Sequence, residues 1–269
     1  MRVLSLVAAF AIVGYLGLLA IFFTTQRKLL YYPSQTPTTL IEARANPAFS
    51  EISVKTHDGI ELKGWYAPAT TKPYTIVFFH GNADSLRYAC QIADPYIANG
   101  YGFFLAEYRG YSGLPGKPSE SGLYNDGRAY LQELLSRGID SRHIVLFGHS
   151  LGTGVAIQMA TEYRAGGMML LAPYLSIPKV AQTAFPFIPA GLLALDRFEN
   201  ERKISRLQLP LLVANGSSDQ VIPPSQGEKL FQLANEPKEF HSLPGRGHND
   251  AFDDFASLSL DWMKRLPDH

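Results

Sequence analysis

From residue 74 onward, short apolar runs alternate with longer stretches in which apolar residues recur at helical spacing. Apolar runs of this length predict strands buried on both faces, and strands joined through helices form a parallel sheet covered on both sides. The predicted strands are 75–79, 101–106, 144–147, 168–171, 209–214 and 239–243, and the predicted helices are 86–98, 122–136, 151–163, 225–233 and 255–266. The chain is therefore expected to have an α/β fold.

Two further strands are predicted ahead of this series. Ile52, Val54 and Thr56 alternate with polar neighbours, an Asp58-Gly59 pair follows, and alternation resumes over residues 60–66. Alternation on both sides of an Asp-Gly pair is typical of a β-hairpin. We therefore expect the folded domain to begin near residue 49 and to cover residues 49–269.

The N-terminus is a different kind of segment, because residues 3–23 contain no charge. As a helix they would reach roughly 30 Å, the thickness of the hydrocarbon core of a membrane. We predict a membrane anchor over residues 1–28; a cleaved signal peptide and a helix buried in the domain are the alternatives. Arg2 and the α-amine on one side balance Arg27 and Lys28 on the other, so the positive-inside rule leaves the side of the membrane undetermined.

Residues 29–48, which contain three prolines and several Thr and Ser, predict an extended connector between anchor and domain. A second irregular segment, residues 174–206, interrupts the alternation between two strands and is rich in Pro and Phe. It is interpreted as a cap inserted over the sheet.

Composition excludes several classes of partner. The 24 basic and 24 acidic residues form no block of like charge, so nucleic acid is not an expected partner. The single cysteine, Cys90, excludes an internal disulfide and a cysteine-based zinc site, and its apolar surroundings predict an inert buried thiol. No metal-binding motif is present, and neither a metal nor a cofactor is expected.

The motif Gly148-His149-Ser150-Leu151-Gly152 lies where the predicted strand 144–147 ends and a helix begins. A tight strand-to-helix turn exposes a serine oxygen above the sheet, and glycines two residues on either side let the backbone pass closely. Ser150 is therefore the candidate nucleophile. The alternative, a serine that only caps the following helix, requires neither glycine.

A serine nucleophile needs a base to accept its proton and a carboxylate to orient that base. Asp219 follows the strand 209–214, and His248 follows the strand 239–243, so both fall at the carboxyl edge of the predicted sheet. We predict a Ser150, His248, Asp219 triad. Asp250 is kept as an alternative acid, although its closeness in sequence to the histidine makes the inward geometry awkward.

Acyl transfer also needs two backbone N–H donors for the developing oxyanion. One is expected from Leu151, whose N–H opens a helix and has no partner within it. The other is expected from the loop after strand 75–79, from Asn82 or alternatively from Gly81. The same loop is also an ordinary strand-to-helix turn in which Asp84 or Ser85 caps the next helix, and the two interpretations are compatible.

Together these motifs resemble the abhydrolase-domain branch of the α/β-hydrolase superfamily, from about Leu29 to the end of the chain. The resemblance implies a mostly parallel eight-stranded sheet with helices on both faces and acyl hydrolysis without a cofactor. The chain has Glu107 where that pattern more often has Asp. The motifs are His80-Gly81-Asn82, Glu107-Tyr108-Arg109-Gly110-Tyr111-Ser112-Gly113, Gly148-His149-Ser150-Leu151-Gly152, Ser218-Asp219, Gly247-His248-Asn249-Asp250 and the lead-in Gln26-Arg27-Lys28-Leu29-Leu30-Tyr31-Tyr32-Pro33.

The expected cap gives the one hint about substrate. Phe185, Phe187 and Leu192 would form an apolar wall above Ser150, suited to an acyl chain, or would simply bury the cap against the sheet. The expected function is hydrolysis of a carboxylic ester or thioester in a lipid-like or acylated substrate beside membrane lipid. Peptidase-type amide hydrolysis is the runner-up, and a non-catalytic membrane-bound scaffold is the alternative from another class.

Overall fold

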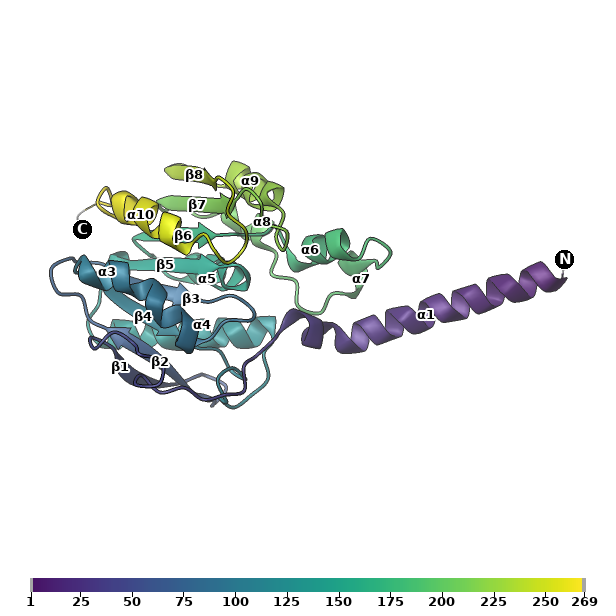
Figure 1. Cartoon of the computed structure of the whole chain (residues 1–269), viewed down its shortest axis with the longest axis horizontal. Coiled ribbons are helices and arrows are strands. Elements are labelled where there is room, and N and C mark those ends of the chain that lie inside the picture. Colours follow the sequence, from purple (N-terminus) through teal and green to yellow (C-terminus); the bar gives the residue numbers. More distant parts are fainter. Residues whose placement is uncertain (1, 268–269) are drawn as a thin grey trace.

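The computed structural model describes residues 2–267, and eight strands of this range form one sheet (Figure 1). In spatial order the strands are β1, β2, β4, β3, β5, β6, β7 and β8. Their bounds are Ser50–Lys55 (β1), Glu61–Ala67 (β2), Thr75–Phe79 (β3), Gly102–Ala106 (β4), Ile144–His149 (β5), Gly167–Leu171 (β6), Leu211–Gly216 (β7) and Lys238–Leu243 (β8).

Strand direction separates the edge hairpin from the rest of the sheet. β2 pairs antiparallel with both β1 and β4, whereas every pairing from β4 to β8 is parallel. The hairpin turns at Gly59, whose φ of 85° favours glycine. The prediction of a mostly parallel eight-stranded sheet is confirmed. Because the six strands β3 to β8 share one direction, the loops after them meet at one edge of the sheet.

Helices cover both faces of the sheet, as Figure 1 shows. On one face lie α4 (Glu120–Ser136), α5 (Leu151–Glu162), α8 (Asn200–Ile204) and α9 (Pro224–Leu233), and on the other lie α2 (Leu86–Ala89), α3 (Asp94–Ala98) and α10 (Phe252–Met263). Each face has its own hydrophobic core, and the side chains of β3 and β5 contribute alternately to both. This is the reason for the continuous apolar runs in these strands.

The helix predicted over residues 86–98 is divided in the structure. A 3₁₀ segment, η1 (Cys90–Ala93), separates α2 from α3, and Pro95 lies in the first turn of α3. Proline has no N–H to donate to the preceding turn, which disfavours one continuous helix here. A second 3₁₀ turn, η2 (Ser141–His143), precedes β5.

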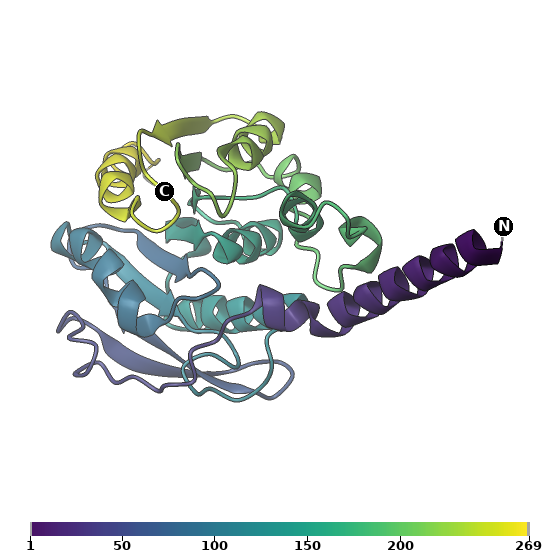
Figure 2. The same cartoon turned by 45° about the vertical axis from the view of Figure 1, so that its right-hand side comes forward.

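The N-terminal helix α1 (Arg2–Leu30) projects from the domain, as Figures 1 and 2 show from two directions. Among the described residues it is the helix long and apolar enough to cross a membrane, and its most apolar window has no buried residue. The helix runs two residues beyond the predicted anchor, and Tyr31, directly after it, is buried in the domain. The segment that follows packs on the domain through Ala43 and Phe49.

The segment predicted as a cap divides into two parts. α6 (Ile177–Ala184) and α7 (Ala190–Leu193) form a small lobe beside α1 (Figure 2). α8 instead contacts α5 and α9, and buries Asn200 and Ile204. The protruding cap is therefore the α6–α7 lobe, whereas α8 belongs to the helical layer on the sheet.

Candidate active site

Ser150 lies at the turn between β5 and α5, and its backbone is in the left-handed region with φ of 50°. A Cβ on Gly152 would lie 1.9 Å from the Phe79 carbonyl oxygen, and a Cβ on Gly148 would lie 2.6 Å from the Thr153 Cα. Both glycines are therefore required sterically. A non-glycine residue at positive φ costs free energy and occurs most often at functional sites.

A chain of hydrogen bonds links the three predicted triad residues. The Nε2 atom of His248 lies 2.9 Å from the Oγ of Ser150, and its Nδ1 lies 2.7 Å from Oδ2 of Asp219. Because a carboxylate only accepts, Nδ1 donates to Asp219, which leaves the Nε2 lone pair to accept the serine proton. The residues come from the loops after β5, β7 and β8, at the shared edge of the sheet.

Asp219 is fixed by contacts on both of its oxygens. Its Oδ1 accepts hydrogen bonds from the backbone N–H groups of Val221 at 2.8 Å and Ile222 at 2.9 Å. Burial raises the pKa of this carboxyl, but the hydrogen bond from His248 and those from the two backbone N–H donors favour the ionised form, and the net pKa lies below its ordinary value. The group is therefore ionised and oriented before any substrate binds.

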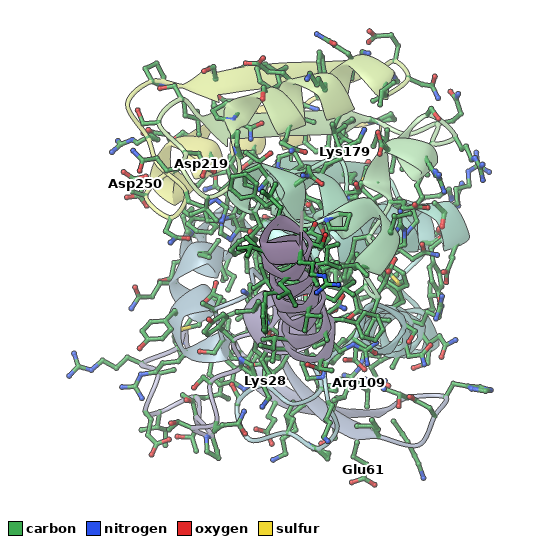
Figure 3. The ribbon with its side chains drawn as sticks, turned by 90° about the vertical axis from the view of Figure 1, so that its right-hand side faces the viewer. Lys28, Glu61, Arg109, Lys179, Asp219 and Asp250 are labelled. Carbon is green, nitrogen blue, oxygen red and sulfur yellow. The ribbon has the colours of Figure 1, made fainter. Side chains whose placement is uncertain are left out.

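Asp250, the alternative acid, has a different role. It is exposed, and its Oδ1 accepts the backbone N–H of Gly247 at 2.6 Å. In the view along α1, Asp250 lies at the outer edge of the molecule and Asp219 lies further in (Figure 3). The carboxylate in contact with the His248 ring is that of Asp219.

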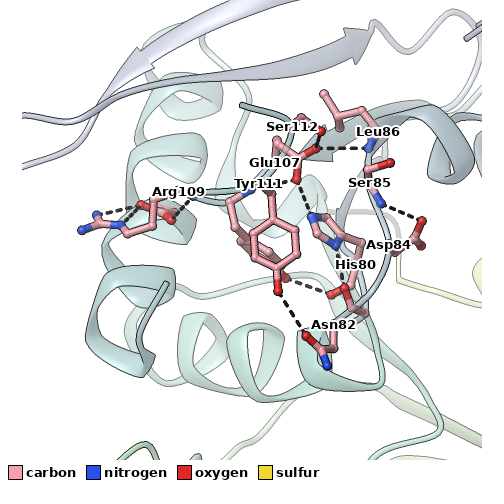
Figure 4. Close-up of polar contacts among 12 residues, drawn as sticks. His80, Asn82, Asp84, Ser85, Leu86, Glu107, Arg109, Tyr111 and Ser112 are labelled. Atoms are coloured by element: carbon pink, nitrogen blue, oxygen red, sulfur yellow. Dashed lines mark hydrogen bonds and ion pairs between the residues drawn. The ribbon is translucent and has the colours of Figure 1, made fainter. Parts of the chain in front are cut away.

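The loop after β3 approaches Ser150 through Gly81, where an added Cβ would lie 3.5 Å from the Ser150 Cβ. The Nδ1 of His80 donates to the Gly81 carbonyl at 2.8 Å (Figure 4). In a trans peptide the carbonyl and the next N–H point in opposite directions. This bond therefore fixes the Gly81–Asn82 peptide plane and with it the direction of the Asn82 N–H.

The side chain of Asn82 is anchored as well. Its Oδ1 accepts from the backbone N–H of Tyr32 at 2.8 Å and from the Tyr111 hydroxyl at 3.3 Å. Leu151, the other predicted oxyanion donor, is the first residue of α5, where the N–H has no partner within the helix.

The His80–Glu107 pair supports this loop, and sequence reasoning assigned it no role. The Nε2 of His80 lies 2.7 Å from Oε1 of Glu107, and both side chains are buried. Burial lowers the pKa of His80, but the charge and hydrogen bond of Glu107, together with Asp84 and the Gly81 carbonyl, outweigh burial and raise the pKa overall. Each ring nitrogen faces an oxygen acceptor, which is the arrangement of a ring protonated on both nitrogens. The available signal was the His-Gly motif and the Glu before Tyr-Arg-Gly, both of which the family resemblance included.

Glu107 makes several contacts besides His80. Its Oε2 accepts from the Ser112 hydroxyl at 2.6 Å and from the Leu86 N–H at 3.2 Å (Figure 4). Burial raises the pKa of Glu107, but the charge of His80 and these donors lower it overall. The pair is thus a buried ion pair with its remaining oxygens satisfied.

His149, beside Ser150, packs rather than contacting the serine oxygen. Its Nε2 donates to the His248 carbonyl at 3.2 Å, and its ring centroid lies 4.7 Å from that of Phe252. Burial lowers the pKa of His149 to about 3, so the ring is neutral.

A cavity of about 600 Å³ opens beside Ser150 and His248. Gly81 and Asn82, from the loop after β3, also line it. Apolar side chains contribute to the wall, and two carboxylates, Asp84 and Asp253, also reach it. The apolar contributors are Tyr88, Ile92, Val221 and Phe252.

Phe185, Phe187 and Leu192, expected to wall the space above Ser150, are placed elsewhere. They lie on the α6–α7 lobe, and none of them lines the cavity at Ser150. Phe187 and Leu192 are exposed, and Phe185 packs edge-on against Phe22 of α1. The reason is the direction of the lobe, which extends away from the sheet toward α1.

The comparisons with known proteins agree with this architecture. Residues 71–200 match the family model described as serine aminopeptidase, S33. The chain is 36% identical to the protein Rv2307c of Mycobacterium tuberculosis, over 98% of this chain and 95% of that protein. It is 36% identical to alpha/beta hydrolase domain-containing protein 17B of Xenopus laevis, over 66% of this chain and 61% of that protein.

Among solved structures, the esterase Pf2001 of Pyrococcus furiosus superposes with a TM-score of 0.69 at 18% identity, over 88% of this chain and 98% of that one. At this identity the likeness concerns the fold alone. With the matching family model, the relatives and the fold taken together, the chain belongs to the α/β-hydrolase superfamily, in its abhydrolase-domain branch.

Proposed function

We propose that this protein is a membrane-anchored serine hydrolase that cleaves carboxylic ester or thioester bonds of acylated or lipid-like substrates. The observation that supports it most directly is the hydrogen-bonded series from Ser150 through His248 to Asp219, at the edge of a cavity of about 600 Å³. A serine hydroxyl is a weak nucleophile unless a neighbouring base removes its proton, and this series supplies that base in the required tautomer.

In the acylation step, Ser150 Oγ attacks the substrate carbonyl carbon while its proton passes to Nε2 of His248. The carbonyl oxygen becomes an oxyanion that the N–H groups of Asn82 and Leu151 stabilise. Asp219 stabilises the imidazolium that forms. The tetrahedral intermediate then collapses, the carbonyl–oxygen or carbonyl–sulfur bond breaks, and His248 returns its proton to the departing alcohol or thiol.

In the deacylation step, His248 takes a proton from a water molecule, whose oxygen attacks the acyl carbon of the Ser150 ester. The same two N–H groups stabilise the second oxyanion. When the bond to Ser150 Oγ breaks, the proton on Nε2 passes to the serine oxygen, and the carboxylic acid product leaves. Every proton is thus accounted for by side chains in the series and by water.

The character of the cavity favours an acyl group on the substrate. Tyr88, Ile92, Val221 and Phe252 contribute apolar surface to its wall, close to Ser150. We therefore replace the cap residues Phe185, Phe187 and Leu192 by these four as the proposed contacts of an acyl chain. Burial of apolar surface along such a chain favours binding by about 0.8 kcal/mol per methylene.

Anchoring through α1 rests on its length, its apolar composition and its exposure outside the domain. A signal sequence has the same properties. Full-length protein is expected to stay with membranes through high-salt and carbonate washes, and the native N-terminus measured by mass spectrometry is expected to precede Val3. A mature chain that begins after Phe23 would identify a cleaved signal peptide instead.

A fluorophosphonate probe tests the proposed activity, because it reacts with activated serines. Full-length protein is expected to become labelled, and Ser150→Ala is expected to lose both labelling and hydrolysis of p-nitrophenyl acyl esters. Ser136→Ala, on the exposed end of α4, is the control. Ser112→Ala is unsuitable, because Ser112 contacts Glu107. Absence of labelling in the folded wild-type chain would favour the non-catalytic scaffold.

Amide hydrolysis is kept as a second candidate, because Asp84 and Asp253 line the cavity and a carboxylate can bind a substrate amine. The description of the matching family model points the same way. Burial raises the pKa of Asp84, which weakens its case as a permanently charged partner. Comparison of kcat/KM for an acyl ester, an acyl thioester and an aminoacyl amide of one fluorogenic series separates the two candidates.

A further inference from the structure

We propose that the tip of the α6–α7 lobe, residues 184–195, is a second membrane contact that inserts into the lipid bilayer alongside α1. The inference rests on the membrane anchoring proposed above. It concerns a surface that the proposed active site leaves unused, since the tip does not line the cavity at Ser150.

The composition of the tip is unusual for an exposed segment. Residues 184–195 read Ala-Phe-Pro-Phe-Ile-Pro-Ala-Gly-Leu-Leu-Ala-Leu, twelve consecutive residues without a charged or hydrogen-bonding side chain. Phe187 is 81% exposed and Leu192 is 87% exposed, and Phe185 and Leu195 are about half exposed. Contiguous exposed apolar surface marks an interaction site.

The contacts between the tip and α1 identify the partner as the bilayer. The Tyr15 hydroxyl donates to the Phe187 carbonyl at 2.7 Å, and the rings of Phe22 and Phe185 meet edge-on with centroids 5.7 Å apart. Tyr15 lies eight residues before Phe23, the last residue of the apolar stretch 3–23, which is about 12 Å along the helix. If α1 inserts over its uncharged length, Phe187 is therefore carried below the membrane surface with it.

Several backbone polar groups of the tip are satisfied within the protein, as lipid requires of groups that it surrounds. Gln182 Nε2 donates to the Pro186 carbonyl at 2.8 Å, and Tyr15 satisfies the Phe187 carbonyl. Pro186 and Pro189 have no N–H to satisfy. These bonds are of little value in water, where solvent would satisfy the same carbonyls.

Side chains at the base of the lobe complete this pattern. Gln26 of α1 donates to the Leu193 carbonyl at 3.1 Å and accepts from the Leu195 N–H at 2.8 Å. Arg27 forms a bidentate pair with Asp196, at 2.7 and 3.1 Å. Along the direction of α1, the apolar residues of the helix and of the lobe thus give way to charged residues at the same position. Two elements that cross one membrane boundary would show this pattern.

Basic side chains lie around this boundary. In the view along α1, Lys28 lies near the base of the helix and Lys179 lies on the side of α6 (Figure 3). Lysines at the level of the lipid headgroups are favoured by anionic lipids. The boundary that we infer therefore passes close to Arg27, with residues 184–195 on its apolar side.

Depth-dependent fluorescence tests the proposal on full-length protein in vesicles of phosphatidylcholine and phosphatidylglycerol. An environment-sensitive nitrobenzoxadiazole label is attached to Phe187→Cys, to Val13→Cys in the middle of α1 and to Ser136→Cys. Ser136 is exposed at the end of α4, at the edge of the sheet opposite the loops that hold Ser150. The wild-type chain, whose one cysteine is buried, gives the background labelling.

The emission of the label at residue 187 is expected to shift to the blue, and nitroxide-labelled acyl chains are expected to quench it. The label at residue 13 is expected to behave in the same way. The label at residue 136 is expected to be quenched only by aqueous iodide. If the label at residue 187 behaves like the label at residue 136 while the label at residue 13 is in lipid, the proposal is overturned but the membrane anchor stands. If all three respond to iodide alone, the anchor itself fails. A blue shift at 187 that appears only with several chains per vesicle would indicate contact with a second copy and also overturns the proposal.

Discussion

The backbone N–H of Tyr32 donates a hydrogen bond to Oδ1 of Asn82 at 2.8 Å. Tyr32 lies two residues after α1, and Asn82 lies in the loop expected to hold the oxyanion. The segment that follows α1 is thus bonded directly to the candidate active site. The position of the oxyanion loop therefore depends on residues outside the sheet and its helices.

Asn82→Ala is expected to reduce kcat for an activated ester by about tenfold, with little change in KM. The variant keeps its backbone N–H but loses the acceptor for Tyr32 and Tyr111, and removal of an oxyanion donor outright costs about 10²- to 10³-fold. Steady-state kinetics of the full-length chain measure the effect. Asn46→Ala, which removes a half-buried asparagine from the connecting segment that contains Tyr32, is the matched control and should behave as wild type. Equal rates for both variants would disprove a supporting role for the Asn82 side chain.

Asp219→Asn is expected to lower kcat by about 10⁴-fold, because the amide favours the histidine tautomer that cannot accept the serine proton. Asp250→Asn is expected to lower kcat far less, since its carboxylate accepts only the Gly247 N–H in the loop. Both variants remove one negative charge from the same region, so the comparison controls for charge. A larger loss in Asp250→Asn than in Asp219→Asn would reverse the assignment.

Gly152→Ala is expected to destabilise the fold and to disturb the turn at Ser150, because its Cβ would lie 1.9 Å from a backbone oxygen of Phe79. The backbone of Phe79 cannot move aside as a flexible side chain can. The free energy of unfolding is therefore expected to fall by at least the roughly 1–3 kcal/mol that overpacking usually costs. Gly191→Ala, where nothing lies within 4 Å, is the control and should leave the melting temperature within about 1 °C of wild type. Thermal unfolding followed by circular dichroism measures both; similar melting temperatures would contradict the steric argument.

His149 makes folding stability depend on pH. Its pKa is about 3 in the folded chain and near its ordinary value of 6.5 when unfolded. Between these values the unfolded chain binds a proton that the folded chain does not, so stability falls as the pH is lowered from about 6.5 toward 3, by up to about 1.4 kcal/mol per pH unit.

His149→Gln should lose this contribution. Urea unfolding of wild type and variant in detergent, at about pH 7.5 and about pH 5, gives for each protein the change in the free energy of unfolding with pH. The difference between these two pH dependences isolates the contribution of His149 from those of other titrating groups. The absolute stability of the variant does not enter the comparison. Identical slopes would show that the ring titrates alike in the folded and unfolded chain.

The sheet could be predicted from the sequence because each strand from β3 to β7 is buried on both faces and reads as an apolar run. Thr75–Phe79 was predicted with the bounds that the structure has. β8 was also located, although its residues are only partly buried, because the strands and helices alternate regularly. The order of the strands was not predicted, because periodicity does not encode which strands are neighbours.

The candidate triad could be predicted from the order of its residues and from the strands that they follow, whereas their distances required the structure. The His80–Glu107 pair was not identified, because the two residues are separated by 27 positions and nothing local links a histidine in one loop to a glutamate after another strand. The pairing follows from parallel contact between β3 and β4, whose carboxyl ends lie side by side.

The direction of the cap could not be predicted either. Phe185, Phe187 and Leu192 have the same composition whether they face a cavity or a membrane, and both surroundings are apolar. What distinguishes the two is the position of Tyr15 and Phe22 on α1, which lie far away in the sequence. Hydrophobicity predicted an apolar contact for the segment but did not predict that the lobe would lie beside α1.

The junction between α1 and the domain is short and held by contacts with the domain. The helix continues to Leu30, Tyr31 is buried, and Tyr32 is bonded to Asn82. A flexible tether would let an enzyme sample a hemisphere of positions above the bilayer, with a reach that grows as the square root of its length. If α1 crosses a membrane as proposed, the helix would instead hold Ser150 at one height and one tilt. Such an enzyme would sample its surroundings by lateral diffusion in the plane of the membrane, and a target group standing above or below that height would stay beyond its reach.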